Sequence, residues 1–220
     1  MAPGVKVSSA KVRPFVAPAR RHRTTGDSGS GGDHHERPFI SNGMLAILAL
    51  IGTEAMFFAG LLGSFLVFRL SAPFWPPPAL PRLPITVTWV NTFVLMSSAV
   101  TMGLAVRAVH QNRQRRMRRF LLATGGLGVT FLAVQGVEWI RLIAHGLKLS
   151  SGAYGGTFYT LIGCHAAHVT AAVIWLACVI VAAMRGRYNA RNPGGVELCA
   201  AYWYFVCAIW PVLFVMVYLM

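Results

Sequence analysis

Five long apolar runs fill nearly all of the chain after Phe39, and they constrain the fold more than any other feature. They cover residues 44–68, 85–109, 120–144, 158–184 and 198–220. Each run is long enough to cross a bilayer as an α-helix, which takes about 20 residues. Only 12% of the residues are charged, about half the share that is usual in a soluble domain. The sequence therefore predicts an all-α polytopic membrane protein, a bundle of five transmembrane helices.

The first 38 residues differ in character from the rest. They are rich in Pro, Gly, Ser and Arg and show no hydrophobic periodicity, so they bury too little surface to offset the entropy of ordering. We expect a disordered, basic, cytoplasmic tail over residues 1–38 and a five-helix transmembrane domain over residues 39–220. A mitochondrial transit peptide is the alternative, but Pro3, Pro14 and Pro18 disfavour the amphipathic helix that it needs.

The net charge of +14 would suggest nucleic-acid binding in a soluble protein. Here the basic residues lie between the apolar runs, so we expect no nucleic-acid partner. Five helices place 16 of the 20 Lys and Arg residues on one side, within the tail, residues 107–119 and residues 185–191. The other side holds four: Arg69, Arg82, Arg141 and Lys148. Basic residues favour the cytoplasmic side, which predicts a bacterial plasma (inner) membrane protein with a cytoplasmic N-terminus and a periplasmic C-terminus.

Four polar residues inside the runs are the candidates for function: Glu54, Glu138, His165 and His168. A charged side chain at the centre of a membrane costs at least about 2.5 kcal/mol, so such residues are rarely incidental. Glu54 lies about 15 Å into the first helix, near the midplane. It is either a proton-carrying or lipid-facing group, or a protonated residue that serves packing alone.

Glu138 and His165 are expected at matching depths, about 9 and 10 Å from the same membrane surface. Their depths predict a pair between the third and fourth helices. Gln135, Glu138 and Arg141 share one helix face at a spacing of three, which suggests a polar seam between helices. Such a seam could also serve packing alone, since polar pairs hold membrane helices together.

The sequence contains no complete active site that we can identify. His165 and His168 lie on one face of one helix, so they cannot hold a haem from both sides. HExxH is absent, and nothing near "CHAAH" obviously completes a zinc site. None of the four cysteines belongs to a CxxC pair. We therefore expect no catalytic residue, no metal and no cofactor in this chain.

Several segments resemble subunit III of the haem–copper respiratory oxidases. "IGTEAMFFAGLLGSF" resembles the family's helix with a glutamate and two phenylalanines, which places Glu54 at the intramembrane glutamate. "FWPPP" with "VNTFVLMSSAVTMGLA" resembles the next loop and helix. "GVTFLAVQGVEWIRLIAHGLKLSSGAYGGTFYTLIGCHAAHVTAAVIWL" and "ELCAAYWYFVCAIWPVLFVMVYL" resemble the later helices. The resemblance spans residues 40–220 in order, and its five-helix length is similar to the short form of the family.

This resemblance implies an accessory subunit of a terminal oxidase in aerobic electron transport. The oxidase as a whole would accept electrons from cytochrome c or from quinol. Subunit III packs on subunit I, contacts other oxidase subunits, binds membrane phospholipid and supports proton uptake, while haem and copper lie in the partner subunits. Tyr204 and Cys207 depart from the family pattern, where His and Asp are usual. An accessory subunit of a nitric oxide reductase and an independent proton-coupled transporter remain alternatives.

Overall fold

The computed structural model describes residues 42–75 and 85–219. The expected tail and most of the proline-rich loop lie outside these residues. Five helices, each apolar and long enough to cross a membrane, confirm the predicted fold: α1 (Asn42–Ser71), α2 (Ile85–His110), α3 (Gln114–Ala144), α4 (Gly152–Met184) and α5 (Gly194–Phe214), the last extended by a π-helical turn (Val215–Leu219).

Four helices begin earlier than their apolar runs, α1 by two residues, α5 by four, and α3 and α4 by six each. α3 begins at Gln114 rather than Phe120, because the intervening Gln, Arg and Met residues are all good helix formers. α4 begins at Gly152 rather than Phe158. Hydrophobicity marks only the part of a helix that lies in lipid, and the backbone continues beyond it.

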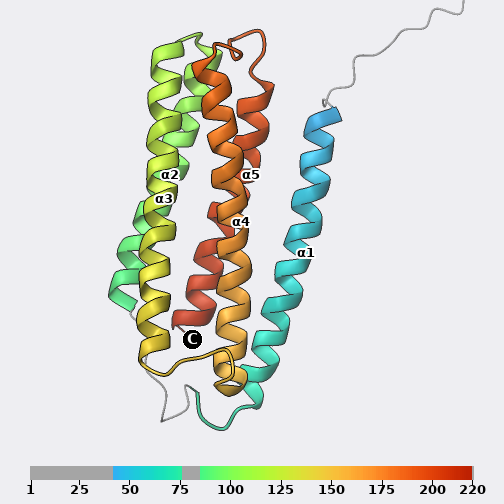
Figure 1. Cartoon of the computed structure of the whole chain (residues 1–220). Coiled ribbons are helices and arrows are strands. Elements are labelled where there is room, and N and C mark those ends of the chain that lie inside the picture. The colour runs from blue at the N-terminus through green and yellow to red at the C-terminus, as the bar shows by residue number, and fades with distance from the viewer. Residues whose placement is uncertain (1–41, 76–84, 220) are drawn as a thin grey trace, which may run out of the picture. The chain divides into compact units, whose positions relative to one another are not determined.

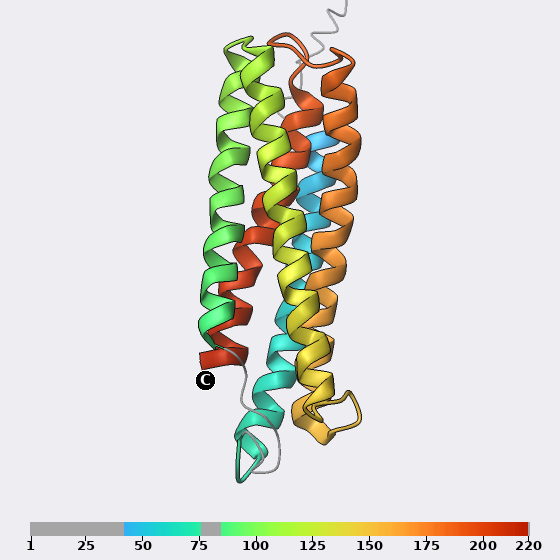
Figure 2. The ribbon, with the colours of Figure 1, turned by 60° about the vertical axis from the view of Figure 1, so that its left-hand side comes forward.

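Helices α2 to α5 pack side by side, and α1 lies beside α4 at the edge of this group (Figures 1 and 2). Helix α1 makes its tertiary contacts with α4 and α5. It buries only Ile47, Phe58 and Phe65 among its 30 residues. Most of α1 is therefore available to lipid or to another subunit.

Helix α5 supplies the largest part of the core, with Trp203 and Trp210 almost fully buried. The indole Nε1 of Trp203 donates to Ser98 Oγ over 3.1 Å, and that of Trp210 donates to Thr92 Oγ1 over 2.9 Å. Both hydroxyls belong to α2 and donate onward to carbonyl oxygens of their own helix. These bonds fix α5 against α2 with no buried indole donor left unsatisfied at either tryptophan.

Candidate functional site

One polar contact joins α1 to α4 in the interior of the two helices. Nε2 of His168 lies 2.5 Å from Oε2 of Glu54. Both residues are candidates from the sequence, but their pairing is not evident from it, because 114 positions separate them. The structure thus brings together two of the four predicted site residues.

The hydrogen bonds around His168 determine how many protons the Glu54–His168 pair carries. Nδ1 of His168 lies 2.6 Å from the carbonyl oxygen of Cys164. A carbonyl only accepts, so Nδ1 carries a hydrogen. The short contact between Nε2 and the Glu54 carboxyl group also requires a proton. The pair is therefore either imidazole with carboxylic acid or imidazolium with carboxylate, and both forms have zero net charge, which limits the cost of placing them in a membrane.

Aromatic rings and the membrane face enclose the Glu54–His168 pair. Phe58, one turn after Glu54, meets the His168 ring edge-on with centroids 5.1 Å apart, and Phe57 lies 6.1 Å from it. The side chains of Glu54 and His168 remain 21% and 19% exposed. A cavity of about 370 Å³ opens onto them beside Thr53 and Phe57. The pair is accordingly reachable from the surface of the bundle.

His165 lies in a closed aromatic box. Its ring stacks on Trp210 with centroids 5.1 Å apart and meets Phe131 and Phe58 edge-on. The residue is 1% exposed, and neither ring nitrogen has a hydrogen-bond partner. The predicted pair with Glu138 is therefore wrong, because neither ring nitrogen bonds to that carboxylate and the contacts of the His165 ring are aromatic.

Glu138 pairs along its own helix. Its Oε1 lies 3.0 Å from Nη1 of Arg141, so the carboxylate is neutralised by the residue three positions later, although that arginine is largely exposed. Gln135, one turn earlier, donates to the Tyr218 hydroxyl over 3.3 Å. The predicted seam on α3 is present, but it reaches the end of the chain rather than His165.

An aromatic cluster at the loop end of α1 was not predicted from the sequence. The ring of Trp75 meets Phe65 and Tyr154 edge-on, with centroids 5.8 and 5.0 Å away. The Arg69 guanidinium lies 5.7 Å from the same ring, a distance typical of a cation–π contact. A tryptophan before a proline-rich loop is expected at a membrane boundary, and that expectation gave no sign of its packing between α1 and α4.

A comparison with protein-family models matches residues 24–220 to cytochrome c oxidase subunit III. The chain belongs to the cytochrome c oxidase subunit III family. Among its relatives, subunit 3 of Synechocystis is 31% identical over 193 residues, which is 87% of this chain and 81% of the relative. That of Thermostichus vulcanus is 31% identical over 190 residues, 86% of this chain and 92% of the relative. The human subunit 3 is 29% identical over 191 residues, which is 84% of this chain and 72% of the relative.

Membership in this family establishes the general role of the chain. It is a multi-pass subunit III of a haem–copper oxidase, a component of the respiratory chain that functions in a complex with other subunits. Subunit III is the cofactor-free subunit of these oxidases. Within residues 42–75 and 85–219, no three His, Cys, Asp or Glu side chains are grouped so that they could hold a metal ion.

The structure gives a local account of the two residues that depart from the usual subunit III pattern. Cys207 is 3% exposed and lies 3.9 Å from Ser98 Oγ, next to the Trp203 bond. Tyr204 is 41% exposed, and its hydroxyl occupies the space that a side chain at Gly103 would need. Cys207 thus belongs to the α2–α5 contact, whereas Tyr204 lies on the outer side of α5.

Proposed function

We propose that this subunit III packs directly against the haem-bearing subunit I, binds membrane phospholipid and supports proton uptake by the assembled oxidase. Of the four candidate residues, none of which is then catalytic, Glu54 and His168 are the lipid- or proton-related pair. Glu138 and His165 support the packing of the bundle. The observation that carries the proposal is the low burial of α1, since only 11% of its most apolar window is buried within this subunit. This membrane helix is therefore mostly without protein neighbours in the described part of the chain.

The open surface of α1 is suited to contact with another membrane helix. A Cβ atom built on Gly52, Gly60 or Gly63 would meet no atom within 4 Å, so these positions face away from the bundle. Met56 is 77% exposed on the same helix. Small residues allow membrane helices to approach closely, because lipid offers no hydrophobic drive for association. A helix of subunit I is the partner that we assign to this surface.

The Glu54–His168 pair supports the proton-related part of the proposal. It holds one exchangeable proton between two groups and remains partly exposed beside a cavity. Within the described residues, neither group belongs to a cluster of three His, Cys, Asp or Glu side chains that could hold a metal ion. The pair is equipped to hold and exchange a proton while the chemistry of oxygen takes place in another subunit.

The proposed orientation follows from the charge of the helix connections. Arg113, Arg115, Arg116, Arg118 and Arg119 lie at or just after the α2–α3 turn. The α4–α5 connection, at the same end of the bundle (Figure 1), holds Arg187 and Arg191. We assign this end to the cytoplasm of a bacterial cell by the positive-inside rule, and the end of α1 with the proline-rich loop to the periplasm.

Affinity purification of the tagged chain from its native membrane, in a mild detergent, tests the direct partner. We expect haem absorption and oxygen consumption to co-purify with the chain. We also expect a cross-linker attached to the thiol of the G60C variant to join the chain to subunit I. G126C is a matched control, because Gly126 also has no atom within 4 Å of a built Cβ but lies on α3. Recovery of the chain without haem, or cross-linking to subunit I from G126C alone, would contradict the proposed interface.

A further inference from the structure

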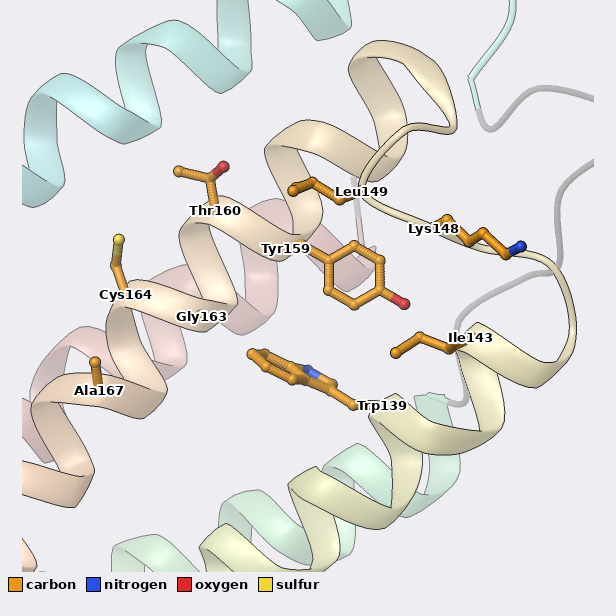
Figure 3. Close-up of a pocket in the computed structure, with 9 residues that line it drawn as sticks. All are labelled: Trp139, Ile143, Lys148, Leu149, Tyr159, Thr160, Gly163, Cys164 and Ala167. Atoms are coloured by element: carbon orange, nitrogen blue, oxygen red, sulfur yellow. The ribbon is translucent and has the colours of Figure 1, made fainter.

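A groove of about 640 Å³ lies between α3 and α4, on the side of the connection that joins them (Figure 3). Trp139 and Ile143 line it from α3, and Tyr159, Gly163 and Ala167 line it from α4. Its volume is within the range of about 300–1,000 Å³ that is usual for sites of small organic ligands. The groove is thus large enough for part of a lipid molecule.

Gly163 and the aromatic pair shape the floor of this groove. The rings of Trp139 and Tyr159 meet edge-on with centroids 5.7 Å apart, and the Tyr159 hydroxyl donates to the carbonyl oxygen of Leu147 over 2.8 Å. A Cβ on Gly163 would already lie 3.4 Å from the Trp139 ring. A larger residue at position 163 would therefore fill the space, which glycine leaves open.

The groove is elongated and carries a charge at one end only. Ala167 and Lys148 lie at opposite ends of the row of lining residues, and the Lys148 ammonium points outward from the connection (Figure 3). Tyr159 and Ala167 are eight positions apart, which corresponds to about 12 Å along α4. A ligand that fits must therefore be long, apolar at the Ala167 end and polar at the Lys148 end.

Lys148 supplies the argument for an acidic headgroup. It is exposed, and its ammonium has no ion-pair partner within the part of the chain that the structure describes. Glu138, an acidic residue of the adjoining helix, is already paired with Arg141. A basic residue near a membrane surface contributes about 1 kcal/mol toward binding an anionic lipid, so the open charge favours a phosphate that lacks a compensating amine.

We propose that the α3–α4 groove is a site for one anionic phospholipid, with an acyl chain along Gly163 and Ala167 and the headgroup phosphate at Lys148. The inference rests on the lipid-binding role proposed above and adds the place, the orientation and the headgroup charge of the lipid. The site is separate from the cavity beside the Glu54–His168 pair, because the two share none of their lining residues.

Native mass spectrometry of the purified oxidase complex, exchanged into detergent with defined lipid, tests the site. The probes are phosphatidylglycerol and phosphatidylethanolamine of equal chain length. We expect about one phosphatidylglycerol to be retained per subunit III, with about fivefold weaker retention after Lys148→Ala, as the loss of one basic contact implies. Ala167→Phe, which fills the apolar end, should remove the retained lipid. Lys148→Arg, which keeps the positive charge that Lys148→Ala removes, should retain the lipid as the parental chain does.

Two controls match these variants. Arg185→Ala removes an exposed cation from the other end of α4, and Ala171→Phe enlarges an exposed alanine one turn beyond the groove. Neither should change retention. Equal retention of both lipids, or retention unaffected by Lys148→Ala and Ala167→Phe, would overturn the inference. Haem content measured in the same samples separates this from the proposed function: an assembled haem complex without the lipid contradicts the groove alone, and a lipid-bearing chain without haem contradicts the partnership alone.

Discussion

Glu54 and His168 are joined by a contact of 2.5 Å between Oε2 and Nε2, and this contact connects α1 to α4. Nδ1 of His168 is bonded to the carbonyl oxygen of Cys164 and carries a hydrogen. The net charge of the pair is therefore the same whether the remaining proton lies on Nε2 or on the carboxyl group. The contact can therefore hold a proton in either of two places without placing a net charge in the membrane.

Glu54→Gln should leave the assembly and its turnover largely intact. The glutamine amide can donate to Nε2 of a neutral His168, so the link between α1 and α4 persists without charge. The measurement is oxygen consumption by membranes that carry the variant, normalised to assembled haem. Small losses in proton coupling or activity lifetime fit an accessory role. Abolished turnover with normal haem content would instead make Glu54 part of an obligatory proton path.

His168→Ala should be more harmful, because it leaves the Glu54 carboxyl group without its partner, at a cost of about 1–3 kcal/mol. The double variant of Glu54→Ala with His168→Ala should lose less stability than the sum of the two single variants, since each removes the same contact. Thermal unfolding of the purified complex measures these losses. Strict additivity would show that the two residues do not interact.

His165 is predicted to contribute packing rather than polar contacts. Both of its ring nitrogens lack a hydrogen-bond partner inside a box of aromatic rings, and replacing a buried unsatisfied polar group by an apolar one is close to neutral. His165→Phe should change the stability by less than about 1 kcal/mol, whereas His165→Ala leaves a cavity and should cost about 2–4 kcal/mol. A large loss for His165→Phe, measured by thermal unfolding, would reveal a polar partner such as a buried water.

The α3–α4 connection should depend on a glycine at one position but not at the next. A Cβ on Gly155 would overlap the carbonyl oxygen of Lys148, whereas one on Gly156 would lie 3.8 Å from the nearest backbone oxygen. Gly155→Ala should therefore cost about 1–3 kcal/mol, and Gly156→Ala should be neutral or mildly favourable within α4. The yield and thermal stability of the two purified variants give the comparison. Equal behaviour would mean that the connection can move aside at no cost.

The helices were predictable because their signal is local and strong. Each apolar run had to become a spanning helix, since a membrane offers the backbone no other partner. The errors lie at the helix ends, chiefly at the starts of α3, α4 and α5, where the helix extends beyond its apolar run. The candidate residues were also identifiable, because charge in an apolar run is costly wherever the helix lies.

The partners of those residues were less predictable, because depth fixes a residue along the membrane normal but not around the helix axis. Glu138 and His165 were expected at the same depth, as a true pair would be. In the structure, however, Arg141 forms an ion pair with the Glu138 carboxylate, and Trp210 stacks on the His165 ring. Rotation of each helix is set by packing, here by the tryptophans of α5 and their hydroxyl acceptors on α2. The α3–α4 groove likewise requires two helices to be placed, so no single segment of sequence could indicate it.

The orientation in the membrane can be tested at two exposed positions at opposite ends of the bundle. The variants K148C and R116C place a thiol in the α3–α4 connection and just after the α2–α3 turn, respectively. Because 16 of the 20 basic residues share the side of Arg116 under this topology, the positive-inside rule assigns that side to the cytoplasm.

A membrane-impermeant maleimide applied to intact cells with a permeable outer membrane should label K148C at once and R116C only after the inner membrane is opened. The parental chain is the control for its four native cysteines, of which Cys178 is exposed on α4. Labelling of R116C but not K148C in intact cells would invert the orientation, and it would also move the proposed phospholipid site to the cytoplasmic leaflet.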